Sequence, residues 1–272
     1  MSSDNLIYDI RTSDNAFKTL VDITGVPYSI WADYFLRSSD YENDDELVLD
    51  VIETHGDFNT TFKDWSFVYF HITTSANNCE AIKKYGVMDL KRSYMCQESE
   101  LRIFLDNHKI EVDLDAHILH YKETTHDISY NECPADEDSD LYYRWCVGRK
   151  FYYDFTTCGF LSVWEHIPYA GFVHRRPEIL WDIDNLLDTD LAHEWELSYT
   201  PHQVIIQTCG KNIIVDGEPN LNDRERSLTF LIKAYTTAFG KPSEEEILLK
   251  NHIQVFPKDI IEIKPFLLWN TN

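Results

Sequence analysis

FVYFHITTSANNCEAIKKYG, residues 67–86, joins a strand pattern directly to a helix pattern. Its first seven residues are aromatic, β-branched or otherwise suited to a strand that is buried on both faces. Asn77, followed three residues later by Glu80, predicts a capping box at the start of a helix, and Gly86 is suited to a left-handed helix end. The stretch therefore predicts a buried strand that runs into a short capped helix.

Two polar side chains interrupt the apolar strand. His71 and Thr73 are two residues apart, so they point to the same face and can hold one ligand together. The amides at the start of the following helix would lie close to that face and would favour a phosphate or a polar amide. The ordinary alternative is a histidine that is satisfied within the core, which is the commoner role of a histidine on a buried strand.

Composition and charge describe a folded, acidic protein. The chain has 272 residues, of which 43% are hydrophobic and 14% aromatic, far from the profile of a disordered chain. Asp and Glu outnumber Lys and Arg by 47 to 24, giving a net charge of -23, so duplex DNA is disfavoured as the main partner. The six cysteines form no CxxC pair and no apolar run reaches membrane-spanning length, which predicts a cytoplasmic protein with reduced thiols and no membrane association.

The remaining patterns predict a single α+β domain over residues 1–272. Residues 1–64 form its helical N-terminal part, with helices over 13–25 and 28–36 and a third that follows an acidic loop at 40–50 and ends at Gly56. Further helices are predicted over 97–109 and over 221–240, the latter capped by Asn222 and ended by Gly240. Strands are predicted within 141–164, in 203–209 and 211–217 as a hairpin or two successive strands, in 245–249 and in 253–263.

A second candidate element is the acidic run that precedes the strand at 245–249. Glu244 and Glu246 share one face of any strand, so both can enter one cleft. A carboxylate at the mouth of a strand suits a reaction in which positive charge develops. The ordinary alternative is a solvated strand entrance, which is what three consecutive acids usually mark.

Together these two elements resemble the ADP-ribosyltransferase superfamily of toxins and poly-ADP-ribose polymerases. HITTSANNCEAIKKYG resembles the strand-to-helix opening of that superfamily, and EEEILL resembles its glutamate strand. Of the middle motif, Tyr142 and Tyr153 are spaced like the two nicotinamide-stacking tyrosines of one branch, whereas Thr156-Thr157-Cys158 is loosely similar to the Ser-Thr-Ser of the other. The resemblance implies a split β-sheet core over residues 65–272 that binds NAD as a substrate.

The resemblance also implies roles for the candidate residues. Glu246 would stabilise the oxocarbenium-like centre that forms when nicotinamide leaves the ribose, and Glu244 would orient or deprotonate the acceptor. His71 and Thr73 would hold the ribose or the nicotinamide amide. Tyr142 or Tyr153 would stack on the nicotinamide ring.

The implied function is an NAD-dependent ADP-ribosyltransferase of toxin or phage-defence type, with a protein side chain or a nucleic-acid base as acceptor and an antitoxin or inhibitor as a further partner. Glu196, in Glu194-x-Glu196 before another strand, is the competing catalytic glutamate. The alternative function is a catalytically silent acidic interaction protein, such as an inhibitor or immunity partner, and a nuclease is a weaker third. No metal site is expected, because His117 and His120 match no familiar ligand set.

Overall fold

The centre of the molecule is a mixed sheet built on two long antiparallel strands. The computed structural model describes residues 6–56, 60–129, 132–154, 156–162, 172–214, 221–240 and 245–266. Strands β2 (Ser66–Ser75) and β7 (Thr200–Cys209) pair without a register shift from Ser66 opposite Cys209 to Ser75 opposite Thr200. The strand order is β10-β7-β2-β6-β9-β8, and β1 adds to β2 in parallel. The fold class is therefore α+β, as the sequence predicts.

The other elements have the following bounds. The remaining strands of this sheet are β1 (Ile7–Asp9), β6 (Cys158–Phe160), β8 (Ile213–Ile214), β9 (Glu246–Leu249) and β10 (Ile260–Pro265), and a second sheet contains β3 (Ile110–Asp113), β4 (Ile118–Tyr121) and β5 (Thr124–Asp127). The helices are α1 (Ser13–Thr24), α2 (Tyr28–Leu36), α3 (Asp44–His55), α4 (Glu80–Tyr85), α5 (Leu90–Met95), α6 (Glu100–Asn107), α7 (Asp140–Tyr152), α8 (Glu178–Leu187), α9 (Leu191–Ser198) and α10 (Asp223–Phe239).

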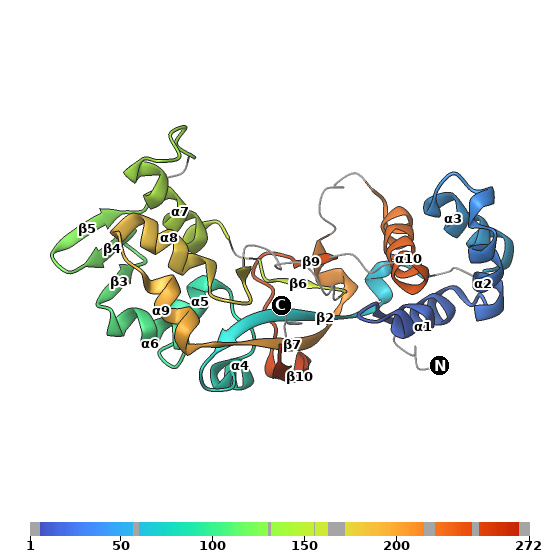
Figure 1. The fold of residues 1–272 in the computed structure, drawn as a ribbon, viewed down its shortest axis with the longest axis horizontal. Coiled ribbons are helices and arrows are strands. Elements are labelled where there is room, and N and C mark those ends of the chain that lie inside the picture. The colour runs from blue at the N-terminus through green and yellow to red at the C-terminus, as the bar shows by residue number, and fades with distance from the viewer. Residues whose placement is uncertain are drawn as a thin grey trace.

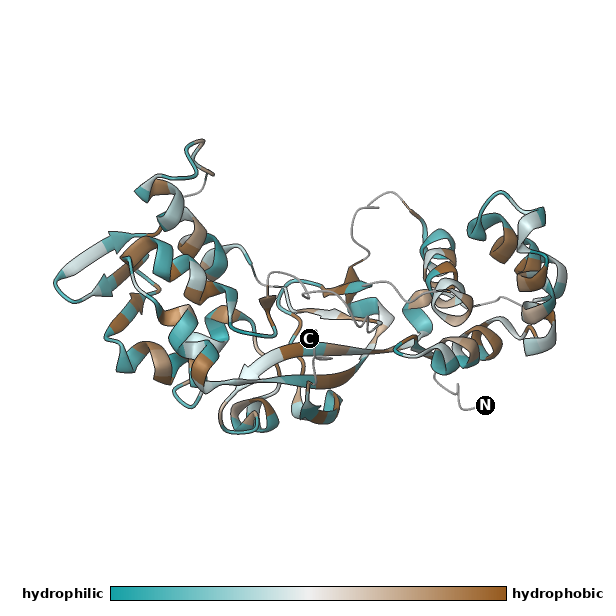
Figure 2. Cartoon of the chain, in the orientation of Figure 1, coloured by the Kyte–Doolittle hydropathy of each residue, from teal (hydrophilic) through white to brown (hydrophobic). Residues whose placement is uncertain are grey.

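Helices gather at the two ends of the central sheet, so the molecule is elongated (Figure 1). At one end, α1, α2 and α3 pack with α10, and their apolar faces join one face of the sheet in a first hydrophobic core. At the other end, α5 to α9 and the small β3-β4-β5 sheet enclose a second core of their own. Figure 2 shows hydrophobic stretches along the central strands and on the inner sides of these helices.

A buried hydrogen bond ties the second lobe to the sheet. Trp195 of α9 has 2% of its surface exposed, and its indole Nε1 donates to Oγ1 of Thr74 on β2 over 2.7 Å. The same indole stacks on Tyr199, with ring centroids 3.5 Å apart. Because an indole N–H buried without a partner is unfavourable, this bond fixes where α9 meets the end of β2.

Several predicted helix boundaries are confirmed. Helix α1 ends at Gly25, whose φ of 70° is the left-handed conformation that glycine adopts readily. Helix α10 begins with a capping box between Asn222 and Glu225 and is followed by Gly240. The helix predicted over 97–109 is α6, which buries Leu101, Phe104 and Leu105 on one face.

Two assignments from sequence are wrong. The acidic loop predicted at 40–50 is largely helix α3, which starts after Asn43 and carries Asp44, Asp45 and Glu46 in its first turn, where negative charge favours the helix dipole. Residues 141–152, predicted as strand from their aromatic content, lie in helix α7, and only Cys158–Phe160 is strand. Because α7 packs in the second core, tertiary burial outweighs the β propensity of its aromatic residues.

The sequence also misses or misassigns parts of both sheets. The β3-β4-β5 sheet is not predicted, and His117 and His120 lie in it and its turn rather than on a helix. Of the two alternatives predicted for 203–217, the described residues form two successive strands, β7 and β8, rather than a hairpin, because β8 pairs with β9.

Candidate functional site

Strands β2 and β6 are neighbours in the central sheet but form one residue pair, Phe70 opposite Phe160. The place where this pairing ends is called the split below. His71 occupies the start of the split, where its Nδ1 lies 2.9 Å from the carbonyl oxygen of Cys158. Because a carbonyl oxygen can only accept, Nδ1 carries the proton and Nε2 is left as a hydrogen-bond acceptor.

A cavity of about 220 Å³ opens at this split, where the sheet meets the second lobe. Its lining comes from β2, from the segment between α4 and α5, from the end of α7 and the residues up to the start of β6, and from the start of α8 and the residues before it. These residues are His71, Ile72, Thr73, Thr74, Met88, Asp89, Leu90, Lys150, Asp154, Thr156, Thr157, Cys158, Val173, Arg176, Pro177, Glu178 and Ile179. A second cavity of about 200 Å³ shares His71, Thr73 and Thr74 with it. Clefts between structural units are common ligand sites.

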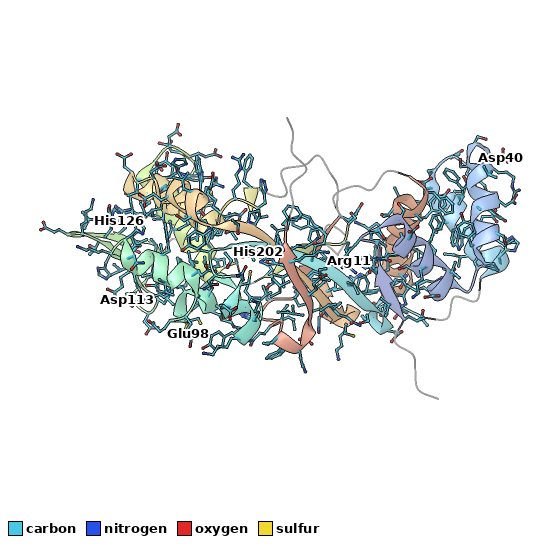
Figure 3. All side chains as sticks on the ribbon, turned by 60° about the horizontal axis from the view of Figure 1, so that its bottom comes forward. Arg11, Asp40, Glu98, Asp113, His126 and His202 are labelled. Carbon is cyan, nitrogen blue, oxygen red and sulfur yellow. The ribbon has the colours of Figure 1, made fainter. Side chains whose placement is uncertain are left out.

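The cavity receives side chains from both faces of the sheet. Strand alternation puts His71 and Thr73 on one face and Ile72 on the other. Cys158 lies on the face of Ile72, because Phe160 pairs with Phe70 and each of these two residues is two positions from the one in question. Figure 3 labels His202, which is the register partner of Thr73 on β7, near the middle of the molecule. A ligand in the split can therefore contact groups from either face.

His71 is held in its neutral form. Burial lowers the pKa of its imidazole, and the hydrogen bond to Cys158 offsets that effect only in part. A neutral ring with Nδ1–H fixed on a carbonyl presents Nε2 to a hydroxyl or amide donor. His71 and Thr73 are thus positioned to bind a polar, uncharged group such as a ribose hydroxyl or a carboxamide.

Glu246 does not share a face with His71. It pairs with Phe160, which pairs with Phe70, so these three residues form one row across β9, β6 and β2, and His71 points to the opposite face. Glu246 is exposed at the first position of β9. Its charge does affect one residue of the cavity wall, Cys158. The pKa of the Cys158 thiol is raised to about 11, mainly by burial and further by the charges of Glu178 and Glu246.

The neighbours of Glu246 have different positions. Glu244 lies outside the described residues. Glu245 is hydrogen-bonded through its carboxylate to Nζ of Lys233 on α10, so it anchors the start of β9 to that helix.

Most amides of the turn between β2 and α4 are hydrogen-bonded within the protein. The amide of Ala76 donates to Glu100, those of Asn77 and Cys79 donate to the hydroxyl of Ser75, and that of Glu80 donates to the side chain of Asn77. Cys79, in a left-handed conformation, takes the N-cap position predicted for Asn77. These four amides are therefore already bonded, which weakens the prediction that this turn and the start of α4 favour a phosphate.

The two candidate versions of the middle motif lie in different places. Tyr142 lies on α7, where it stacks on Trp145, and Tyr153 ends that helix with 52% of its surface exposed; neither lines the cavity. Thr156, Thr157 and Cys158 all line it. The structure brings together His71, Thr73 and the Thr-Thr-Cys segment, and it leaves the two tyrosines apart from them.

Charged residues that sequence reasoning missed form part of the wall. Lys150, from the last turn of α7, is hydrogen-bonded to Glu178 at the start of α8 and lies 3.4 Å from Asp154. Nearby on α8, burial raises the pKa of Asp182 to about 6, although the positive charge of Lys150 acts to lower it. The sequence carried no usable signal for this group, because residues 141–152 were assigned to strand and α8 was not predicted.

The competing glutamate lies just before a strand, as predicted, but on a helix. Glu194 and Glu196 belong to α9, which directly precedes β7, and Glu194 is bonded to His108. Glu196 pairs with Arg176 of the cavity wall over 3.6 Å. Within the described ranges no three His, Cys, Asp or Glu side chains form a group that could hold a metal ion, and none of the helices there is long and apolar enough to cross a membrane.

Comparison of the chain with protein-family models, with curated proteins and with solved structures gives no match. Any function for the cavity therefore has to be argued from its own geometry.

Proposed function

We propose that the chain is an NAD-dependent ADP-ribosyltransferase and that NAD binds in the split between β2 and β6. The observation that carries the proposal is the neutral His71, fixed on the Cys158 carbonyl, with its free Nε2 beside Thr73 in a cavity at a lobe junction. This arrangement suits a ribose hydroxyl or the nicotinamide amide. The finer fold assignment, a split sheet of the ADP-ribosyltransferase type, belongs to the same proposal.

The strand order separates the proposed histidine from the proposed glutamate. Strand β6 lies between the histidine strand β2 and the glutamate strand β9, so Cys158 separates His71 from Glu246. Glu246 does not line the cavity, so in this proposal the nicotinamide ribose binds beside His71 and extends past Cys158 to reach the Glu246 carboxylate on the other face of the sheet. In that position Glu246 would stabilise the oxocarbenium-like centre.

Thr156 and Thr157 take the place of the middle motif in this proposal, and the tyrosines do not. Both residues line the cavity, and the Thr156 hydroxyl donates to Asp154 over 3.2 Å; in the proposal these residues contact the carboxamide or ribose. Glu244 is kept as the residue that orients the acceptor, a protein side chain or a nucleic-acid base, in a cytoplasmic toxin or phage-defence effector.

The test is cleavage of NAD by the purified chain, measured as nicotinamide release and as transfer of labelled ADP-ribose to lysate. We expect Glu246→Gln to reduce nicotinamide release about 100-fold or more, as for loss of a group that stabilises transition-state charge. Glu262→Gln, an exposed carboxylate on β10, is the matched control and should retain activity. Glu244→Gln should reduce transfer more than NAD cleavage. Absence of both cleavage and transfer in a folded preparation would sink the proposal.

A second candidate, an acidic interaction protein, is favoured by the surface of α2. This helix exposes Tyr28, Phe35 and Leu36, the last with 81% of its surface accessible. Residues 6–56 around it contain eleven Asp and Glu but three Lys and Arg. An apolar patch within an acidic lobe fits a basic segment with apolar anchors from an inhibitory or target protein.

Calorimetry with a synthetic Lys/Leu amphipathic peptide and its Glu/Leu counterpart tests this second candidate. Selective binding of the basic peptide that is lost in Leu36→Ser, and retained in the control Ile261→Ser on β10, would support it. Equal binding to both variants would reject it, because Ile261 is also exposed but lies far along the chain on another element.

A further inference from the structure

The cavity beside His71 contains an arginine whose hydrogen-bonding capacity is largely unused. Arg176 lines the cavity, and 11% of its side chain is exposed. Its guanidinium carbon lies 5.1 Å from the ring centroid of Trp181, which restrains the plane of the group. The position is therefore both partly desolvated and oriented.

Among the described residues, the guanidinium of Arg176 makes no hydrogen bond. Its one ion-pair partner there is Glu196 at 3.6 Å, longer than a charge-assisted hydrogen bond. Lys150, the other cation in the wall, differs because it is bonded to Glu178 and pairs with Asp154. Arg176 is thus the cation of the wall that can still bind an anion in a bidentate manner.

The start of α8 adds donors beside Arg176. Pro177 is the N-cap and supplies no side-chain cap, and the amides of Glu178 and Ile179 have no partner within the described part of the chain. Both residues line the cavity. The positive end of the dipole of this ten-residue helix therefore points at the same space as the guanidinium.

The carboxylates around Arg176 are mostly compensated. Glu178 and Asp154 are held by Lys150, and Glu196 is the partner of Arg176 itself. Asp182 is buried below, where its charged form is disfavoured. An anion that enters the cavity would meet Arg176 and the α8 amides as its available donors.

We infer that Arg176 and the first amides of α8 form a subsite for a phosphate or diphosphate group. The inference deepens the proposed function by giving the subsite to the pyrophosphate of NAD, and that assignment of the ligand rests on the NAD proposal. His71 and Thr73 would then hold the nicotinamide ribose, with the pyrophosphate extending toward α8.

Calorimetry with the full chain tests the subsite with four probes: NAD, ADP-ribose, inorganic pyrophosphate, and nicotinamide riboside, which lacks phosphate. We expect Arg176→Gln to weaken ADP-ribose and pyrophosphate about tenfold or more, and to change nicotinamide riboside less than twofold. Arg176→Lys should recover part of the affinity, since it keeps the charge but not the fork of donors. Arg175→Gln is the control, because Arg175 is the exposed neighbour and does not line the cavity.

The outcomes separate the two proposals, with thermal unfolding used to verify that each variant is folded. Pyrophosphate binding that depends on Arg176, without binding of NAD or ADP-ribose, would support the subsite and reject NAD as its ligand. NAD binding that is unchanged in Arg176→Gln would reject the subsite and leave the proposed function standing. Equal weakening of nicotinamide riboside and ADP-ribose would also reject it, because it would indicate a general loss of cavity structure. Failure of all four probes would reject both.

Discussion

The carbonyl of Cys158 accepts a hydrogen bond from Nδ1 of His71, and the thiol of the same residue lies on the face of the sheet that carries Glu246. Cys158 thus lies between His71 and Glu246, the two residues that the sequence analysis predicts in one site. At this point the pairing of β2 with β6 ends.

Binding of ADP-ribose should depend on the neutral form of His71. Because burial lowers its pKa below 6.5, we expect constant affinity from pH 8 to 6.5 and weaker binding at lower pH, measured by calorimetry. The lowered pKa also means that folding stability associated with His71 is fully present above pH 6.5 and falls as the pH decreases through the folded pKa. His71→Asn, which retains a donor for Cys158, should lose both dependences, and an unchanged pH profile would contradict the assignment.

Gly159 should be essential for the close approach of β6 to β2. A Cβ there would meet the ring of Tyr69 at 2.5 Å and the carbonyl of Phe70 at 2.7 Å, so Gly159→Ala should reduce the free energy of unfolding by about 2 kcal/mol or more. Urea unfolding measures the loss. Gly25→Ala is the control: nothing lies within 4 Å of its Cβ, and its left-handed conformation alone should cost about 1 kcal/mol. Equal losses in the two variants would contradict the close approach at Gly159.

Substitutions of Thr74 and Thr73 should have different effects, the first on folding stability and the second on ligand binding. Thr74→Val leaves Nε1 of Trp195 buried without a partner, so the free energy of unfolding should fall by about 1 to 3 kcal/mol, measured by urea unfolding with tryptophan fluorescence. Thr73→Val should leave stability nearly unchanged and weaken ADP-ribose, because Thr73 lines the cavity. The reverse pattern would show that the two hydroxyls have other roles.

Asp182 should destabilise the fold at neutral pH. Burial raises its pKa to about 6 from 3.8, so its contribution to stability is fully present below pH 3.8 and is lost as the pH rises through 6. Asp182→Asn should therefore gain up to about 3 kcal/mol in the free energy of unfolding at pH 8 relative to pH 4, a bound set by two pKa units. Thermal unfolding at both pH values measures this, with Glu53→Gln, an exposed carboxylate on α3, as the control. A gain of the same size at both pH values would rule out this titration.

The sequence by itself determined the elements whose signals are local. Strand β2, helix α10 with its Asn222 cap, and helix α1 ending at Gly25 follow from side-chain patterns and backbone preferences within a few residues. The same kind of signal identified His71 and Thr73 as polar groups on a buried strand. These are properties that a short segment carries wherever it packs.

Tertiary structure alone decided which residues meet. The aromatic residues of α7 suit a strand, and only their burial in the second core makes them helical, which in turn brings Lys150 to the cavity. The face of Glu246 depends on the pairing of β6 with both β2 and β9, a long-range register that no local pattern encodes. The opening strand thus fixed the position of His71, and the split beside it, set by contacts between distant segments, determined its neighbours.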